Sequence, residues 1–350
     1  MLVRKLISLL GNLLAAVTGA GLLARFLPPD FWWPPSIIAL LLPGLLLLTL
    51  LFVVWCFYRK WRKALIFPVL VLVAALPLAT RLFSFGAGGN SGARGDTVTL
   101  ITTNVRAFKN DIWESVSEEL SFRFINQRKP DVLLLQETRN DGSDTPYFTE
   151  IKEASGLAKR HQPTRRTVAT YADELDFVAD KFSGAGGYNG FLVTDVKTKL
   201  GTIRVINAHL QSNRITKMAG EVGTDGDMKN EIDRAESMLR SYGAAAAIRA
   251  NQAEEIRRYV RESPHPVIIG GDFNDVPSSY TYQRILTPRL RDAWVEKGFG
   301  MGTTFTGPLP GLRIDFLLVD TSLNLVEMER FDTGFSDHRG LSVEVQKRRE

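Results

Sequence analysis

Acidic, amide and histidine side chains recur at the ends of short apolar runs in this sequence. The clearest case is Gly270-Gly271-Asp272-Phe273-Asn274, which closes the apolar run 267–269. Short runs of Val, Ile and Leu predict strands buried on both faces, and the ends of such strands can hold a catalytic set rigidly. An Asp and an Asn two residues apart at such a place can both face one phosphate or one hard metal ion.

Five further apolar runs carry polar side chains of the same kinds. They are 98–101 with Asn104 and Arg106, 131–135 with Gln136 and Glu137, 203–206 with Asn207 and His209, 316–319 with Asp315, and 341–345 with Asp337 and His338. Taken singly, most have an ordinary explanation, because an Asn after a strand is usually a turn residue and a lone His is usually structural. Asp315 differs, since a charge within an apolar run is costly unless it is paired or bound to metal. The joint pattern indicates a metal-dependent phosphoesterase.

The chemistry that fits these side chains is hydrolysis of a phosphoester. It needs a nucleophilic water, stabilisation of negative charge on phosphorus and help for the leaving oxygen, and a hard divalent ion contributes to the last two. The ligands on offer are oxygens, which favours Mg²⁺ or Mn²⁺. A structural zinc site is not expected, because the catalytic part has neither cysteine nor a His-x-x-x-His pair.

The order of the motifs resembles the endonuclease/exonuclease/phosphatase superfamily over about residues 97–345. The shared motifs are Asn104, Gln136-Glu137, His209-Leu210-Gln211-Ser212, Gly271-Asp272-Phe273-Asn274, Ile314-Asp315 and Ser336-Asp337-His338. The resemblance implies an α/β fold in which two packed mixed β-sheets are flanked by helices, a four-layer sandwich. Residues 167–172 depart from the Gly-x-x-Ile-x-Ser-type strand that many members carry at this place.

The resemblance also implies roles at the metal and at the attacking water. Glu137 is expected to be the principal metal ligand, with Asn104 and Asp337 near it. Asp272 is expected to orient or deprotonate the water, and Asn274 to hold a phosphate oxygen through its amide.

Two histidines and two arginines complete the set that the resemblance implies. His209 and His338 are expected to contact phosphoryl oxygens or to donate protons. Asp315 would fix the tautomer of one of these two histidines, and the sequence leaves open which one. Arg106 and Arg139 are candidates for phosphate contact, although both could equally form ordinary surface ion pairs.

The net charge of +5 comes from the N-terminal end of the chain. Residues 1–85 hold eight basic residues and one acidic residue, whereas the rest hold 35 and 37, a net charge of −2. The catalytic part therefore lacks the overall basicity typical of nucleic-acid domains. The single cysteine, Cys56, excludes a disulfide within one copy and leaves the compartment undetermined.

Three apolar segments, about 6–27, 37–58 and 64–85, have the length that a helix needs to cross a bilayer. Basic residues precede the first segment and fill the loop after the second, which predicts that both lie on the cytoplasmic side. We therefore expect a multi-pass protein of the inner or plasma membrane whose catalytic domain faces the periplasm or the outside. The first segment also resembles a signal peptide, with Ala16 and Ala20 as candidate cleavage-site residues.

The sequence divides into a transmembrane region 1–85, a flexible Gly/Ser linker 86–96 and a catalytic domain 97–350. Within that domain, residues 115–127 and 243–263 predict helices. Residues 213–242, which are polar and carry several glycines, predict an insertion that is either a mobile loop or a helical cap.

Three functions remain open at this stage. The first is a membrane-anchored nuclease or phosphodiesterase that acts on nucleic acid. The second is a phosphoesterase for phospholipids or other head groups, similar to sphingomyelinases or inositol phosphatases. The third, an inactive membrane scaffold, is disfavoured because Glu137, His209, Asp272 and His338 are all present. The expected partners are a phosphoester substrate and the lipid bilayer, and no protein partner can be inferred.

Overall fold

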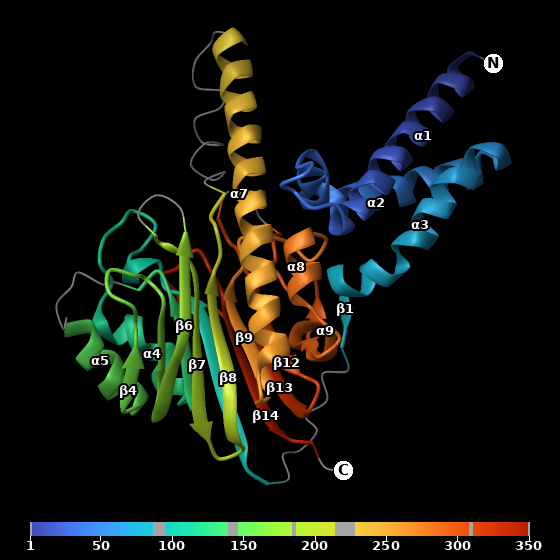
Figure 1. The fold of residues 1–350 in the computed structure, drawn as a ribbon. Coiled ribbons are helices and arrows are strands. Elements are labelled where there is room, and N and C mark those ends of the chain that lie inside the picture. The colour runs from blue at the N-terminus through green and yellow to red at the C-terminus, as the bar shows by residue number, and fades with distance from the viewer. Residues whose placement is uncertain are drawn as a thin grey trace. The chain divides into compact units, whose positions relative to one another are not determined.

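The computed structural model describes residues 2–86, 95–138, 146–183, 187–213, 228–307 and 311–348 (Figure 1). The chain forms two compact units. The first combines Met1–Phe83, Asn213–Ala250 and Asp275–Arg284, and the second combines Ser84–Ser212, Asn251–Asn274 and Ile285–Glu350. Most of the expected linker lies outside the described residues.

Two six-stranded mixed sheets form the second unit (Figure 1). The first sheet has the order β10 (Leu290–Asp292), β12 (Asp315–Asp320), β9 (Val267–Asp272), β8 (Gly201–His209), β7 (Asn189–Thr198) and β6 (Glu174–Ser183). The second has the order β13 (Leu323–Phe331), β14 (Gly340–Lys347), β2 (Thr97–Asn104), β3 (Val132–Gln136), β5 (Ala169–Ala172) and β4 (Lys159–His161). Each sheet contains one parallel pair at its centre, β8 with β9 and β2 with β3, and its other pairs are antiparallel.

The two sheets pack face to face over an aliphatic core. Leu100 and Leu134 from the second sheet meet Val205, Ile268 and Leu317 from the first in one buried cluster. Because both faces of the central strands are covered, these strands are continuous apolar runs, as the sequence predicted.

Helices cover the outer faces of the sheets. Helices α4 (Glu118–Arg128) and α5 (Pro146–Ser155) lie over the second sheet, where Ile125 and Ile151 pack with Leu133. Helix α7 (Met228–Glu262) lies over the first sheet with its C-terminal part, and its Tyr259 contacts Phe191 edge to face. The expected two-sheet fold flanked by helices is confirmed.

Helix α7 begins fifteen residues before the predicted start at residue 243. The polar insertion 213–242 is therefore helical from Met228 onward, while 214–227 lie outside the described residues. In this part of the helix Glu236 and Arg240 form an ion pair at i, i+4 spacing, with an N–O distance of 2.5 Å. The residues before 243 are mostly polar and lack the apolar periodicity on which the sequence prediction depended.

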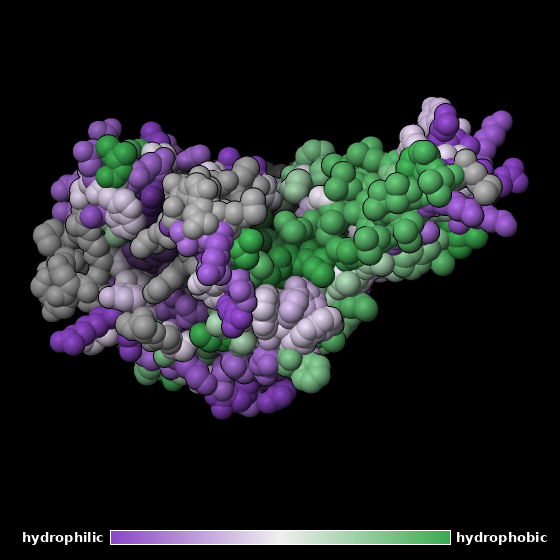
Figure 2. Space-filling model, turned by 90° about the horizontal axis from the view of Figure 1, so that it is seen from above, coloured by the Kyte–Doolittle hydropathy of each residue, from purple (hydrophilic) through white to green (hydrophobic). Residues whose placement is uncertain are grey.

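Three long apolar helices dominate the first unit: α1 (Leu2–Leu23), α2 (Pro34–Tyr58) and α3 (Arg62–Leu82). All three are long and apolar enough to cross a membrane, and Figure 2 shows hydrophobic side chains gathered over them. They pack through Ala15, Leu42 and Val71, and a buried hydrogen bond of 2.9 Å joins the hydroxyls of Thr18 and Thr49. Such interhelical hydroxyl contacts are typical of membrane bundles.

Segments distant in the sequence also join this unit. Tyr242 of α7 donates a hydrogen bond to the carbonyl of Ser36 at 3.2 Å, and Ser278 donates one to the carbonyl of Ala39 at 2.7 Å. Gln283 of the short helix α8 (Tyr280–Ile285) accepts one from Arg81 at 2.6 Å. Helix α7 at Tyr242 and the segment that contains α8 are therefore hydrogen-bonded to the apolar helices.

Candidate active site

The strand register brings the predicted site residues of the first sheet side by side. Asp272, the last residue of β9, is paired with His209 on β8 and with Asp315 on β12. Because β8 runs parallel to β9 and β12 runs antiparallel, the C-terminal ends of the first two strands meet the start of the third. All three side chains are buried.

The second sheet presents its own parallel pair at the same site. Asn104 ends β2 and is paired with Gln136, which ends β3 and precedes Glu137. The Asn104 amide donates to Glu137 Oε1 at 3.1 Å and to Asp272 Oδ2 at 3.2 Å, so it links the two sheets.

Buried hydrogen bonds next to these residues form a bridge between the two sheets. Gln136 Nε2 donates to Asn207 Oδ1 at 2.7 Å, and Asn207 Nδ2 donates to the carbonyl of Ala169 at 2.9 Å. Because Gln136 precedes Glu137 and Asn207 lies two residues before His209, this bridge sets the spacing between the two halves of the site.

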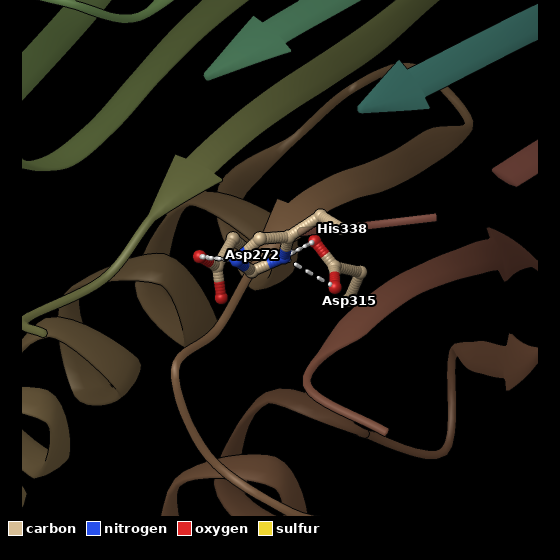
Figure 3. Close-up of side chains that lie close together, drawn as sticks. All are labelled: Asp272, Asp315 and His338. Carbon is tan, nitrogen blue, oxygen red and sulfur yellow. Dashed lines mark hydrogen bonds and ion pairs between the residues drawn. The ribbon is translucent and has the colours of Figure 1, made fainter. Parts of the chain in front are cut away.

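His338 pairs with Asp315, which answers the question that the sequence left open (Figure 3). The Nδ1 atom of His338 lies 2.9 Å from Asp315 Oδ2, and its Nε2 atom lies 3.9 Å from Asp272 Oδ2. The backbone N–H of Asp315 donates a hydrogen bond to the Thr304 hydroxyl at 3.0 Å, which holds Asp315 in place. The imidazole is further packed against the edge of the Phe305 ring at a centroid distance of 5.3 Å.

The pKa values of Asp272 and His338 are both raised, which makes the carboxyl group less ready to ionise and the imidazole less ready to lose its proton. Burial disfavours the carboxylate of Asp272, and with the nearby Asp315 it raises the Asp272 pKa to about 6, although His338 and His209 oppose the shift. Burial alone would lower the pKa of His338, but Asp315 and Asp272 outweigh it and raise that pKa to about 10. At neutral pH, Asp272 is therefore an ionised base with a raised pKa beside a cationic imidazole.

His209 lies on the opposite side of Asp272. Its Nε2 atom is 3.6 Å from Glu137 Oε1, 3.9 Å from Asp272 Oδ2 and 3.4 Å from the amide of Asn189. Its buried Nδ1 atom has no hydrogen-bond partner among the described residues. The side chain therefore faces both carboxylates through a single nitrogen.

Asn274 donates hydrogen bonds to the Asp272 carboxylate. Its backbone N–H donates to Asp272 Oδ1 at 2.8 Å, and its amide nitrogen lies 3.2 Å from Asp272 Oδ2 and 3.0 Å from the carbonyl of Leu210. The expected phosphate contact through this amide remains a prediction, since the structure shows the amide directed at protein acceptors.

Asp337 and Arg106 form the outer edge of the site. Arg106 Nε lies 3.8 Å from Asp337 Oδ1, and its guanidinium also pairs with Asp111 at 2.6 Å. The preceding Ser336 donates a hydrogen bond to the carbonyl of Asn104 at 2.7 Å, which ties this segment to the end of β2. Arg139, the second expected phosphate contact, lies outside the described residues.

The backbone is strained where the site residues leave their strands. Glu137 and Asn274 each have φ +52°, and Arg106 has φ +45°, in the left-handed region that non-glycine residues seldom adopt. Such outliers persist only where the surroundings enforce them, and they cluster at functional sites. Here they turn side chains at three strand ends toward the site.

Three supporting residues were missed by the sequence analysis: Asn189, Thr304 and Ser336. Asn189 is the first residue of β7, and its amide lies 3.4 Å from His209 Nε2. The Thr304 hydroxyl accepts a hydrogen bond from the backbone N–H of Asp315, eleven residues further along the chain. Only Ser336 stood in a motif already identified, where it precedes Asp337. Recognising the other two requires knowing which strands pair.

The carboxylates fit a hard divalent cation on one side of Asp272 better than on the other. The Asn104 amide donates hydrogen bonds to both Glu137 and Asp272, so the two carboxylates lie close together. The Glu137 side chain is 39% exposed. Two carboxylates converging there, one of them open to solvent, offer the oxygen donors and the negative charge that Mg²⁺ or Mn²⁺ prefers. Asp272, Asp315 and His338 also lie close enough to hold an ion, but both oxygens of Asp315 already lie within hydrogen-bond distance of His338 Nδ1.

Comparison with protein families matches residues 101–338 to the Endonuclease/Exonuclease/phosphatase family. Residues 4–82 match a domain of unknown function, DUF8431. No curated protein matches the chain.

Solved structures of low sequence identity resemble the chain. D. rerio TDP2 complexed with single strand DNA product is 15% identical and has a TM-score of 0.49, covering 72% of this chain and 100% of that chain. An endonuclease/exonuclease/phosphatase from Beutenbergia cavernae is 17% identical, with a TM-score of 0.47 and 72% of each chain covered. The human Nocturnin catalytic domain with bound sulfate anion is 16% identical, with a TM-score of 0.46 and coverages of 72% and 95%.

The family match spans more than half of the chain and includes Glu137, His209, Asp272, Asp315 and His338. The two mixed sheets flanked by helices are the fold that the motifs implied. The chain belongs to the Endonuclease/Exonuclease/phosphatase family, whose members are phosphoesterase- and nuclease-type hydrolases.

Proposed function

We propose that this protein is a membrane-anchored, divalent-metal-dependent phosphodiesterase that hydrolyses its substrate by attack of an activated water. The observation that carries the proposal is the position of the buried Asp272. One of its oxygens lies near the cationic His338, and the Asn104 amide links Asp272 to the carboxylate of Glu137. This arrangement combines a base, a fixed positive charge and an oxygen-rich cation site within one cluster.

In the proposed reaction, Asp272 accepts a proton from the attacking water. The water oxygen forms the new bond to phosphorus while the bond from phosphorus to the leaving oxygen breaks. The N–H groups of Asn274 and Asn104 hold the Asp272 carboxylate in place. Its raised pKa of about 6 makes Asp272 a stronger base than an ordinary Asp while leaving it ionised at neutral pH.

The histidines serve the phosphoryl group in this proposal. His338 stays protonated because its pKa is raised to about 10, so its Nε2–H stabilises charge on a phosphoryl oxygen throughout the reaction. Asp315 holds Nδ1 and thereby directs Nε2 toward the reacting group. His209, which faces both Glu137 and Asp272, is the candidate proton donor to the leaving oxygen.

Glu137 would hold the divalent cation, with Asp272 and Asn104 beside it and Asp337 at the outer edge. When bound, the cation supplies Lewis-acid stabilisation of the negative charge on the phosphoryl group. Arg106, next to Asp337, is positioned to add charge at the same edge.

The proposed membrane orientation rests on the basic residues of the first unit. The Arg4 guanidinium lies 5.1 Å from the Trp61 ring centroid, so the N-terminus of α1 and the α2–α3 loop share one end of the helices. That loop contains Arg59 and Lys60, and Arg62 begins α3. Positive ends of this kind stay cytoplasmic, so α3 would lead outward and the second unit would face the periplasm or the outside.

The substrate is proposed at the level of a phosphodiester, of nucleic acid or of a lipid head group. In the decisive experiment, the purified full chain is incubated with plasmid DNA, RNA, sphingomyelin, phosphoinositides or bis-p-nitrophenyl phosphate, and hydrolysis of each substrate is measured. We expect turnover of at least one substrate with Mg²⁺ or Mn²⁺ and none in EDTA. Full activity in EDTA would contradict the metal proposal, and inactivity on the whole panel would favour the scaffold.

Membrane orientation is tested separately with alkaline phosphatase fusions. A fusion after Gly95 should be active and a fusion at Lys63 inactive, because the reporter folds only outside the cytoplasm. The reverse pattern would place the second unit in the cytoplasm.

A further inference from the structure

A small two-stranded sheet in the second unit displays two phenyl rings to solvent. Strand β1 (Ser84–Phe85) pairs with β11 (Phe299–Gly300), so that Phe85 lies opposite Phe299. The rings meet edge to face at 6.5 Å, yet Phe85 is 76% exposed and Phe299 is 72% exposed. Met301, 42% exposed, follows directly. Adjacent large apolar side chains exposed in this way usually mark a binding surface.

The rings stand on a firmly held base. Ser84 Oγ donates to the carbonyl of Val295 at 2.8 Å, and Trp294 Nε1 donates to the carbonyl of Gly300 at 3.2 Å. Gly86 is packed so closely that an added Cβ would lie 2.5 Å from the carbonyl oxygen of Gly298. These contacts hold the backbone that carries the two rings.

The chain connects this sheet directly to α3, a helix long and apolar enough to cross a membrane. Helix α3 ends at Leu82, and β1 begins two residues later, at Ser84. Two residues of extended chain reach only about 7 Å, so Ser84 emerges close to the end of α3. At that depth a bilayer presents its interfacial region, where exposed aromatic rings are favoured over full exposure to water.

We propose that Phe85, Phe299 and Met301 form a lipid-contacting ledge that seats the second unit on the surface of the bilayer that α3 crosses. The occupant is the membrane, because the ledge continues directly from the span. The inference depends on α3 spanning the membrane and is independent of the catalytic proposal.

The single cysteine of the chain allows a direct test. In a Cys56→Ala background, Met301→Cys carries a nitroxide label that leaves both phenyl rings in place. Lys197→Cys on β7 is the matched control, since Lys197 is 59% exposed in the same unit. Both full-length proteins are reconstituted in phosphatidylcholine/phosphatidylglycerol vesicles, and label collisions with oxygen and with water-soluble nickel chelate are measured.

We expect the label at 301 to collide more with oxygen and less with the nickel chelate than the label at 197. Adding Phe85→Ser and Phe299→Ser should move the 301 label toward the values at 197, while the spectrum of a 197 label in that background confirms folding. Equal, water-like values at both sites without the Ser changes would overturn the proposal. Spin–spin broadening at 301 that disappears on dilution with unlabelled chain would assign the ledge to a second copy and would also overturn it.

Discussion

Asp315 holds His338 through Nδ1 at 2.9 Å, and the other ring nitrogen of His338 points toward Asp272. The pair joins residues 23 positions apart, one at the start of β12 and one just before β14. Asp315 therefore fixes both the orientation and the charge of the imidazole.

Replacing Asp315 by Asn should lower kcat by about 10²-fold while the fold persists, because an amide cannot stabilise the imidazolium. The change should also lower the pKa of His338 and move the alkaline limb of the rate profile to lower pH. The measurement is the pH dependence of kcat with bis-p-nitrophenyl phosphate. An unchanged alkaline limb would separate Asp315 from the charge of His338.

The pH profile of the wild-type enzyme should be bell-shaped. Asp272 must be ionised to accept a proton, so kcat/KM should fall as the pH drops below its pKa of about 6. His338 must be protonated, so the rate should fall as the pH rises past about 10. Steady-state assays in Mg²⁺ across this range check both limbs, and a profile flat from pH 5 to 7 would remove Asp272 as the base.

Glu137→Gln should weaken metal dependence before it affects the fold. The loss of one carboxylate at an oxygen site should raise the Mg²⁺ concentration needed for half-maximal rate, and added Mn²⁺ should recover part of the activity. The matched control is Glu329→Gln, which removes a surface partner of Arg128. The idea fails if both variants titrate with Mg²⁺ as the wild type does.

Trp113 offers a test of substrate contact beside the site. It is exposed, its φ is +62°, and the Arg106 guanidinium lies 5.3 Å from its ring centroid. Trp113→Ala should raise KM severalfold with little change in kcat, whereas Trp113→Phe should keep most of the affinity. An equal loss in both variants, or none in either, would exclude stacking on this ring.

The bridge between the sheets predicts a positioning effect. Gln136→Leu would leave Asn207 Oδ1 without its donor in the core, so Tm should fall. If the bridge also sets the spacing of Glu137 and His209, kcat of the folded fraction should fall as well. Ser121→Ala, which removes a buried hydroxyl on α4 that donates to the carbonyl of Ser117, is the control, and it should change Tm alone.

The sequence predicted the strands well because each central strand is buried on both faces and is therefore a continuous apolar run. Runs such as 98–101 and 203–206 became β2 and β8 with only their ends extended. The two-sheet architecture came from the resemblance carried by the motifs, and it is confirmed.

The sequence could not predict which strands are neighbours. His209 and His338 both follow or precede an apolar run, and only the register shows that His209 faces Asp272 across β8 and β9 while His338 meets Asp315. Asn189 and Thr304 were missed for the same reason, because their partners are distant along the chain. The start of α7 was missed because the residues before 243 are mostly polar and lack the apolar periodicity that predicts a helix.

The most direct test of the central claim is kcat of Asp272→Asn measured together with its melting temperature in the purified full chain. Asp320→Asn is the control, because Asp320 is also buried at a strand end but pairs with Arg289 at 2.6 Å away from the site. We expect Asp272→Asn to lower kcat by about 10²-fold or more and to remain folded. We expect Asp320→Asn to lower Tm and to keep kcat in the folded fraction. Normal kcat in a folded Asp272→Asn protein would contradict the mechanism.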